Sequence, residues 1–180
     1  LALAGCCTAT AMAAEPVNPA SDKPPIRVAC VGDSITQGSG AAKGKSYPAQ
    51  LQELLGTSWV VGNFGVSGRT LLKKGDLPYW KEKAYQNALG FKPDVVIIML
   101  GTNDIKPFHG RSAGEASRGM ARLVQIIRGH YAGKMLQAPE IILVAPPPII
   151  HGDWADMMDH FGPDEAIAAS VNFAREYKKR

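Results

Sequence analysis

The chain has 180 residues and a formal net charge of +4, with 46% hydrophobic and 20% charged residues. This length is sufficient for one domain with a sizeable core, and the composition is typical of an ordinary globular protein. The basic residues are scattered, and no aromatic residues are interleaved with them. This pattern argues against a nucleic acid as the partner.

The first part of the chain differs from the rest. Residues 1–14 are small and apolar, and residues 15–25 contain four prolines. We expect residues 1–14 to be part of a secretory signal peptide, 15–25 to be a linker, and 26–180 to be the folded domain. The sequence therefore predicts a protein exported through a bacterial-type signal, to the periplasm or outside the cell.

Two processing sites are possible in the signal segment. Ala11-Met12-Ala13 is an A-x-A cleavage signal, whereas Leu3-Ala4-Gly5-Cys6 is similar to a lipobox. The second would place a lipid on Cys6, and only then would we expect a membrane to be a partner. The apolar run itself is too short to span a bilayer.

Short apolar runs alternate with helical stretches along residues 26–180. The predicted strands are residues 26–31, 58–64, 94–100 and 140–146, and the predicted helices are residues 47–55, 79–89, 112–131 and 162–180. The strands are apolar without alternation, as in sheets that are covered on both faces. The sequence therefore predicts the α/β class, as a three-layer α/β/α sandwich with a doubly wound parallel sheet.

Local signals refine the predicted helices. We expect Gly56 to end the first helix, and Gly90 with Pro93 to end the second. Ser112 and Glu115 have the spacing of a capping box at the start of the third helix. The buried face of the first helix is expected to carry three leucines, namely Leu51, Leu54 and Leu55.

A glycine-rich loop follows the first predicted strand. A P-loop needs four residues between its first glycine and Gly-Lys-Ser, but here five follow Gly38 and three follow Gly40 before Gly44. A dinucleotide loop, G-x-G-x-x-G, fails because Gly44 comes one residue too late. Each miss would redirect the backbone N–H groups, so a nucleotide-binding module is only a remaining alternative.

Cysteines and histidines offer no recognisable metal pattern. Cys6 and Cys7 lie in the signal segment, and Cys30 lies in a predicted buried strand, where a lone cysteine acts as a small apolar residue. Neither C-x-x-C nor H-E-x-x-H occurs. The sequence therefore predicts no disulfide framework, no metal and no cofactor.

Three predicted strands are followed by loops with chemically useful residues. These loops are Gly32-Asp-Ser-Ile-Thr36, Asn63-Phe-Gly-Val-Ser-Gly-Arg-Thr70 and Gly101-Thr-Asn-Asp104. Since the carboxyl ends of parallel strands meet at one edge, the loops should form one crevice. A serine hydroxyl, backbone N–H groups and a neutral amide are what acyl transfer requires. Each motif alone is an ordinary turn, so the argument depends on all three.

As a set, GDSIT, NFGVSGRT and GTND resemble the first three sequence blocks of the GDSL, or SGNH, hydrolase family. The resemblance extends from Ile26 to about Tyr177. Members of this family are serine esterases with a flavodoxin-like sheet. The resemblance therefore implies that activity and that fold here, with Ser34 as the nucleophile. It also implies an oxyanion hole made by the Ser34 N–H, the Gly68 N–H and the Asn103 amide.

Weaker expectations concern residues that could contact the substrate. The candidates are Asp33, Arg69, His109 and His151, which lie in or beside the loops at the expected active edge. His130 lies at a helix end, where it is expected to cap the helix.

The family's fourth block, D-x-x-H, is missing from this sequence. Asp156 and His160 are one residue too far apart, and His151-Gly152-Asp153 has the reverse order. We therefore expect the sequence to be a fragment cut at both ends, with another strand and the catalytic base beyond Arg180. The fourth strand would then be an exposed edge. Otherwise His151 or His109 would have to serve as the base.

The resemblance favours an esterase that deacetylates carbohydrates, since exported relatives of this kind resemble carbohydrate O-acetyl esterases. A lipid or thioester acylhydrolase of the same fold is an alternative. A non-catalytic carbohydrate-binding domain is another. The expected partner is a small-molecule or carbohydrate ester.

Overall fold

The computed structural model describes residues 23–106, 112–150, 161 and 164–180. Its four strands form one parallel sheet in the order β2-β1-β3-β4. They are β1 (Ile26–Gly32), β2 (Trp59–Gly65), β3 (Val95–Met99) and β4 (Glu140–Leu143). The first three agree with the predicted strands to within one residue at each end. Strand β4 stops at Leu143, short of the prolines that begin at Pro146.

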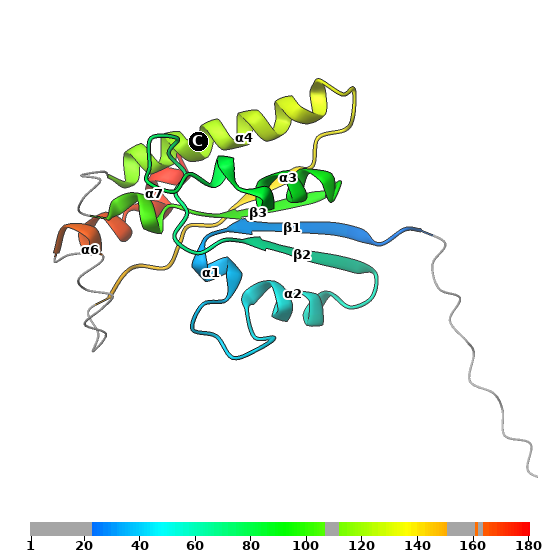
Figure 1. Ribbon diagram of the computed structural model, residues 1–180, viewed down its shortest axis with the longest axis horizontal. Helices are drawn as coiled ribbons and strands as arrows, with labels where there is room; N and C mark the ends of the chain where they lie inside the picture. The colour runs from blue at the N-terminus through cyan, green and yellow to red at the C-terminus, as the bar shows by residue number, and fades with distance from the viewer. Residues whose placement is uncertain (1–22, 107–111, 151–160, 162–163) are drawn as a thin grey trace, which may run out of the picture.

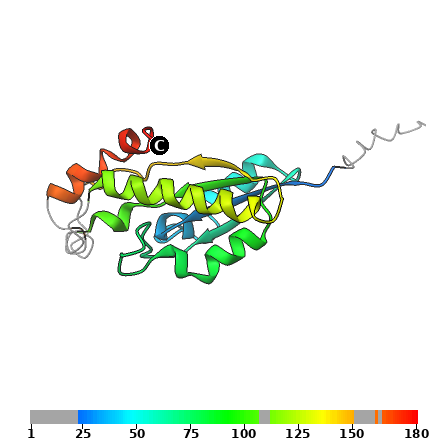
Figure 2. The same ribbon diagram turned by 90° about the horizontal axis from the view of Figure 1, so that it is seen from above.

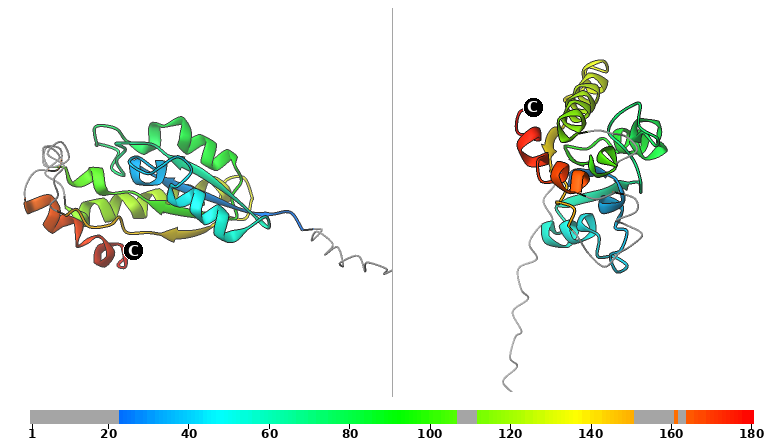
Figure 3. Two further views of the ribbon diagram at one scale, coloured as in Figure 1. Left: turned by 90° about the horizontal axis from the view of Figure 1, so that it is seen from below. Right: turned by 90° about the vertical axis from the view of Figure 1, so that its left-hand side faces the viewer.

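Helices cover both faces of this sheet. They are α1 (Ser34–Gln37), α2 (Tyr47–Leu55), α3 (Lys83–Gly90), α4 (Ala113–Ala132), α6 (Asp164–Ser170) and α7 (Phe173–Tyr177), with 3-10 turns η1 (Tyr79–Lys81) and η2 (Thr102–Ile105). Figure 1 shows α1 and α2 on one face and α3 and α4 on the other. Figure 3 shows the resulting layers from below and from one end. The predicted three-layer α/β class is confirmed.

The strand order explains which face each helix covers. The chain moves outward from β1 to β2 through α2, then returns across β1 to β3 through α3 and continues to β4 through α4. Crossovers between parallel strands are right-handed. A helix that connects strands in one direction across the sheet therefore covers one face, and a helix that connects them in the opposite direction covers the other face. Figure 2 shows α4 lying along the sheet above β3 and β4.

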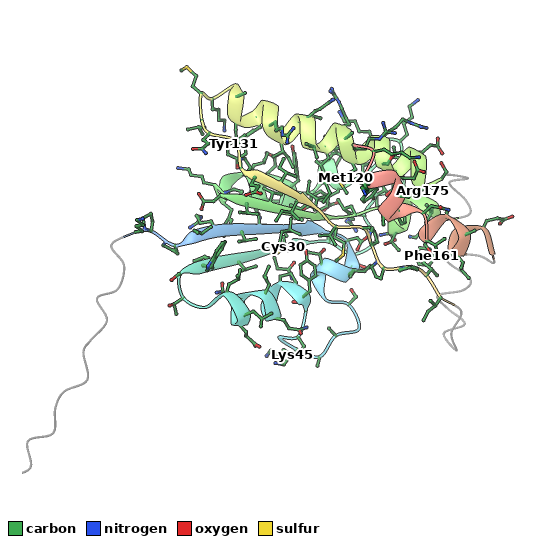
Figure 4. The ribbon with its side chains drawn as sticks, turned by 180° about the vertical axis from the view of Figure 1, so that it is seen from behind. Cys30, Lys45, Met120, Tyr131, Phe161 and Arg175 are labelled. Carbon is green, nitrogen blue, oxygen red and sulfur yellow. The ribbon has the colours of Figure 1, made fainter. Side chains whose placement is uncertain are left out.

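The main core lies between α4 and the sheet. Met120, Leu123 and Ile127 recur at helical spacing and are buried in one cluster with Val96 and Ile98 of β3. Figure 4 shows Met120 between α4 and the sheet. Burying each such side chain stabilises the fold by about 1.5–3 kcal/mol.

Helix α4 begins as predicted. The Ser112 hydroxyl accepts a hydrogen bond from the Glu115 N–H, and the Glu115 carboxylate accepts one from the Ser112 N–H. This reciprocal capping box satisfies two donors that the helix itself leaves unpaired.

The prediction of one helix over residues 79–89 is wrong. The chain forms η1, then takes an extended backbone at Glu82 before α3 begins. An ion pair with a residue outside this segment stabilises the interruption. The Glu82 carboxylate pairs with the Arg69 guanidinium at 2.9 Å. Gly90 also stays helical, and Phe91 is the C-cap.

The prediction of one helix over residues 162–180 is also wrong. Helices α6 and α7 are separated by Val171 and Asn172. The Ser170 hydroxyl donates to the Ile167 carbonyl and accepts from the Ile149 N–H, which ties the end of α6 to the segment after β4. The turn lets α7 bury Phe173 against the core.

The expected leucine face of α2 is wrong at Leu54, which is 84% exposed. A polar residue takes the place near the sheet. The Gln52 side chain donates to the Gly56 and Trp59 carbonyls and accepts from the Val61 N–H, joining α2 to the start of β2. Gly56 does cap the helix, as predicted, with a positive φ of 71°.

Strands β2 and β4 are the two outer strands of the described sheet. Neither has a fully buried residue, so the prediction that every strand is buried on both faces is wrong for both. Ile142 is exposed, whereas the second half of β1 is buried throughout. A hollow of about 330 Å³ lies between α4 and β4, lined by Val124, Ile141 and Leu143 among others. No helix in the described ranges is long and apolar enough to cross a membrane.

Candidate active site

The strand register brings three loops to one level of the sheet. Gly32 at the end of β1 pairs with Gly65 of β2 on one side and with Met99 of β3 on the other. The direction of winding reverses between β1 and β3. Ligand sites of doubly wound sheets lie at such a switch point, outside the carboxyl ends of the strands. The Asp33-Ser34 turn and the Asn103 turn flank this point.

Two glycines allow the short helix α1 to lie directly on the strand ends. A Cβ on Gly32 would come within 1.8 Å of the Thr36 hydroxyl oxygen, and a Cβ on Gly65 would come within 2.3 Å of the Gln37 nitrogen. Both distances are far below contact, so neither position accepts a side chain in this arrangement. The glycines thereby fix the height of Ser34 above the sheet.

Asp33 caps the helix that begins with Ser34. Its Oδ1 accepts a hydrogen bond from the Ile35 N–H at 3.0 Å, and the residue is only 1% exposed. The N–H of the first helical residue has no partner within its own helix, so the Ser34 N–H is directed beyond the helix start.

Burial changes the acidity of this carboxyl. Desolvation, and less strongly the neighbouring Asp104 charge, raises the pKa of Asp33 from its ordinary value of 3.8 to about 6. The Ile35 N–H and the Lys106 charge act in the opposite direction. The carboxylate oxygens of Asp33 serve the protein's own groups, so this geometry gives no support to the expected substrate contact.

Asn103 joins the loop after β3 to the other two loops. Its Nδ2 donates to the Arg69 carbonyl at 3.0 Å and lies 3.4 Å from the Asp33 Oδ2. Asn103 is buried, so these contacts are shielded from water. The structure therefore brings together three of the predicted positions, each from a different loop.

Gly68 lies in the loop after β2, which is tied to α1. The Ser67 N–H donates to the Gln37 side-chain oxygen at 2.7 Å. Gly68 itself has a φ of 77°, a backbone conformation that side-chain-bearing residues rarely adopt. Gly68 directly precedes Arg69, whose carbonyl accepts from the Asn103 amide.

Arg69 has a structural partner on each side. Its Nε donates to Glu82 at 2.9 Å and its Nη1 donates to the Ser67 carbonyl at 2.7 Å. The side chain is about one quarter exposed. Contact between Arg69 and a substrate stays a prediction, whereas its carbonyl already anchors Asn103.

Asp104 is a residue of this site whose role the sequence did not reveal. Its two carboxylate oxygens accept hydrogen bonds from the Leu71 and Leu72 N–H groups, both at 2.9 Å, and the residue is fully buried. It therefore clamps the loop after β2 onto the loop after β3. The acidic residue next to Asn103 was visible in the sequence. Its role was not, because its hydrogen-bond partners lie about thirty residues away.

Helix α7 supports the same loop from behind. The Tyr177 hydroxyl donates to the Leu100 carbonyl at 2.5 Å. A Cβ on Gly101 would collide with that hydroxyl, so this glycine makes room for Tyr177. No local sequence signal pointed to Tyr177.

The predicted contacts of two histidines with the substrate stay predictions. His109 and His151, and also His160, lie outside the described ranges. His130 lies in the last turn of α4. The next residue, Tyr131, donates to the Leu89 carbonyl ahead of β3, so His130 is at the opposite edge of the sheet from Ser34. Figure 4 shows Tyr131 and Phe161 at opposite ends of the molecule.

Among residues 23–106, 112–150, 161 and 164–180, no group of three or more His, Cys, Asp or Glu side chains could hold a metal ion. Cys30 is buried in β1, and desolvation raises the pKa of its thiol to about 11.

The fold and the three loops define an α/β protein with the flavodoxin-like architecture of SGNH hydrolases. The family model of the GDSL-like lipase/acylhydrolase family matches residues 30–177. This range includes all three loops and most of the chain. The chain belongs to that family.

Known proteins support the same assignment. An acetylxylan esterase from Xylanibacter ruminicola is 41% identical over 173 residues, covering 88% of this chain and 36% of that protein. The chain thus spans about a third of the length of this curated relative.

Two solved structures share the fold. A carbohydrate acetylesterase family member from Sinorhizobium meliloti has a TM-score of 0.70 at 28% identity, covering 86% of this chain and 77% of that one. The native aryl esterase of M. smegmatis has a TM-score of 0.72 at 27% identity, covering 86% and 78%.

Proposed function

We propose that the protein is a carboxylic ester hydrolase that removes acetyl groups from carbohydrates, with Ser34 as its nucleophile. The observation that carries the proposal is the contact of the Asn103 amide with Asp33, the residue before Ser34, at the switch point of the sheet. This contact supports a site in which the Ser34 hydroxyl and the neutral Asn103 amide act on the same ester.

In the first step, the Ser34 Oγ attacks the acyl carbon of the ester. A bond forms between these atoms, and the carbonyl electron pair moves to the carbonyl oxygen. The Ser34 N–H, the Gly68 N–H and the Asn103 amide would stabilise this oxyanion. Because the negative charge develops only as the bond forms, the donors lower the barrier more than they strengthen substrate binding.

The two amide hydrogens of Asn103 have different tasks in this scheme. One is held by the Arg69 carbonyl at 3.0 Å, which fixes the side-chain plane. The contact with Asp33 is 3.4 Å, longer than the 2.7–2.9 Å or so of a strong charge-assisted bond. The second hydrogen is therefore held only weakly by Asp33, and we assign it to the substrate oxyanion.

The Ser34 hydroxyl needs a base, because an unactivated serine is a weak nucleophile. The base would take the Ser34 proton and deliver it to the leaving alcohol, and water would then hydrolyse the acyl-enzyme. In the part of the chain that the structure describes, His130 is the one histidine, and it lies at the wrong edge. We assign the base to the chain after β3, where His109 and His151 occur, or after Arg180, as the family resemblance implies.

The substrate class rests on the relatives. The curated relative is described as an acetylxylan esterase, and one structural neighbour belongs to a carbohydrate acetylesterase family. Export would bring the protein to polysaccharides, but residues 1–14 and Cys6 lie outside the described ranges, so export and lipidation are also proposals. The M. smegmatis neighbour, an aryl esterase, favours activated aryl esters as a second substrate class.

The test is Ser34→Ala in the full-length protein, measured as acetate release from acetylated xylo-oligosaccharides. Loss of the nucleophile should lower kcat by about 10⁴-fold or more. Ser39→Ala is the matched control, since Ser39 is exposed five residues further along the same segment. Near-normal turnover by Ser34→Ala would overturn the proposal.

A further inference from the structure

Leu77 is an apolar side chain left partly open at the proposed active edge. It is 43% exposed, although it belongs to the loop that carries Gly68. Its Cδ1 lies 3.6 Å from the point where a Cβ on Gly68 would be. Within the described ranges, nothing else apart from the chain neighbours of Gly68 comes within 4 Å of that point.

The backbone of Leu77 is fixed rather than free. Its carbonyl accepts a hydrogen bond from the Thr70 N–H at 3.0 Å, and the Tyr79 N–H donates back to the Thr70 carbonyl at 3.0 Å. Thr70 is fully buried. The Asp104 clamp on Leu71 and Leu72 holds the same loop from below. Leu77 is thus a pre-organised surface, which binds a ligand without first being ordered.

The oxyanion donors indicate which part of an ester would meet Leu77. A carbonyl oxygen that accepts from the Gly68 N–H would hold the acyl carbon beside Gly68, and Leu77 is the side chain next to Gly68. The leaving alcohol has to face the general acid that protonates it. The acyl group, the other substituent of the acyl carbon, is then left to face Leu77.

We propose that Leu77 forms the wall of the acyl pocket and restricts the enzyme to short acyl groups such as acetyl. The proposal rests on the proposed function, because it takes Gly68 as an oxyanion donor beside the acyl carbon. The methyl group of an acetyl ester would pack on the Leu77 side chain, and a longer chain would collide with it.

The experiment measures kcat/KM of the full-length protein on p-nitrophenyl acetate, butyrate and hexanoate. Leu77→Ala should raise the hexanoate-to-acetate ratio at least tenfold, Leu77→Val should raise it less, and Leu77→Phe should lower the butyrate-to-acetate ratio. One extra or missing methylene in an apolar pocket changes such ratios by about 10–200-fold. Leu54→Ala, which removes an exposed leucine from α2, should leave the ratios unchanged.

Two results would overturn the proposal. One is a hexanoate-to-acetate ratio within twofold of wild type in all three Leu77 variants. The other is a change that follows the alcohol and not the acyl group, tested with methyl, ethyl and phenyl acetates. If Ser34→Ala is inactive while the Leu77 variants give one of these two results, only the assignment of Leu77 to the acyl pocket fails. If Ser34→Ala stays active, the proposed function fails first.

Discussion

The two edges of the sheet carry different kinds of polar residue. At the carboxyl edge, Asp33, Asn103 and Asp104 are buried and bonded to one another's loops. At the amino edge, the Tyr131 hydroxyl also makes a buried contact, with the Leu89 carbonyl, but the carboxylate lies near solvent. The Arg27 N–H donates to the exposed Asp94 carboxylate at 2.7 Å, and Met135 nearby is 95% exposed.

The carboxyl edge contains buried carboxyl groups, which cost desolvation energy, and the amino edge has an exposed carboxylate instead. Burying a carboxylate is unfavourable unless it is hydrogen-bonded, and Asp33 keeps a raised pKa even with its bonds. The amino edge needs no such groups to join its strands. The buried polar cluster is therefore better explained by a site that must hold three loops in fixed positions.

The largest expected difference between the edges is in stability. Asp104→Ala leaves the Leu71 and Leu72 N–H groups without their acceptor, and each lost bond to a charged group costs about 1.5–3 kcal/mol. We expect a loss of about 3–6 kcal/mol in the free energy of unfolding, measured with urea. Asp94→Ala at the amino edge should lose only about 1 kcal/mol. Equal losses would contradict the comparison.

The next effect concerns turnover. Asn103→Ala should lower kcat by about 10²–10³-fold, the usual cost of one oxyanion donor, with little change in KM. Steady-state kinetics on an acetylated sugar checks this, with Asn87→Ala on the exposed face of α3 as the control. A raised KM with normal kcat would make Asn103 a binding residue.

A pH effect of similar or smaller size should come from Asp33. Because its pKa is about 6 when folded and near 3.8 when unfolded, the folded protein holds this proton more tightly. Its contribution is present below about pH 4 and is lost as the pH rises through 6, by about 3 kcal/mol in total at 1.36 kcal/mol per pKa unit. Asp33→Asn, which can still cap α1, should remove this fall.

Urea unfolding at pH 4, 5, 6 and 7 measures both proteins. Other carboxyl groups titrate in each, so the difference between wild type and Asp33→Asn isolates Asp33. That difference should change steadily between pH 4 and 6 and be level above 7. A constant difference across the whole range would show that the pKa of Asp33 is not raised.

The smallest effect is expected at the amino edge. His130→Ala should change kcat by less than twofold and the free energy of unfolding by about 0.5 kcal/mol or less, as is usual for surface sites. The same kinetic and urea measurements check this. A large loss of kcat would bring His130 into the reaction and contradict the separation of the two edges.

The strands were predictable because their pattern is local. The β-branched runs of β1 and β3 locate each strand to within a residue, and alternation with helices indicates a parallel sheet. The helices that were predicted wrongly depend on distant partners. Glu82 interrupts its segment through Arg69, and Ser170 ends α6 through Ile149.

The site was predictable only in part, for the same reason. The position of Ser34 and Asn103 after strands of a parallel sheet places both at one edge. The clamp of Asp104 and the support of Tyr177 involve partners about thirty and seventy-seven residues away, which no local pattern shows. The catalytic roles of Ser34, Gly68 and Asn103 remain predictions.

The most direct test of the central claim is a crystal structure of the full-length protein after reaction with a serine-directed phosphonate. The account predicts phosphorus bonded to the Ser34 Oγ. One phosphoryl oxygen should lie about 2.7–3.1 Å from the Ser34 nitrogen, the Gly68 nitrogen and the Asn103 Nδ2. An adduct on another serine, or a phosphoryl oxygen turned away from Asn103, would contradict the account.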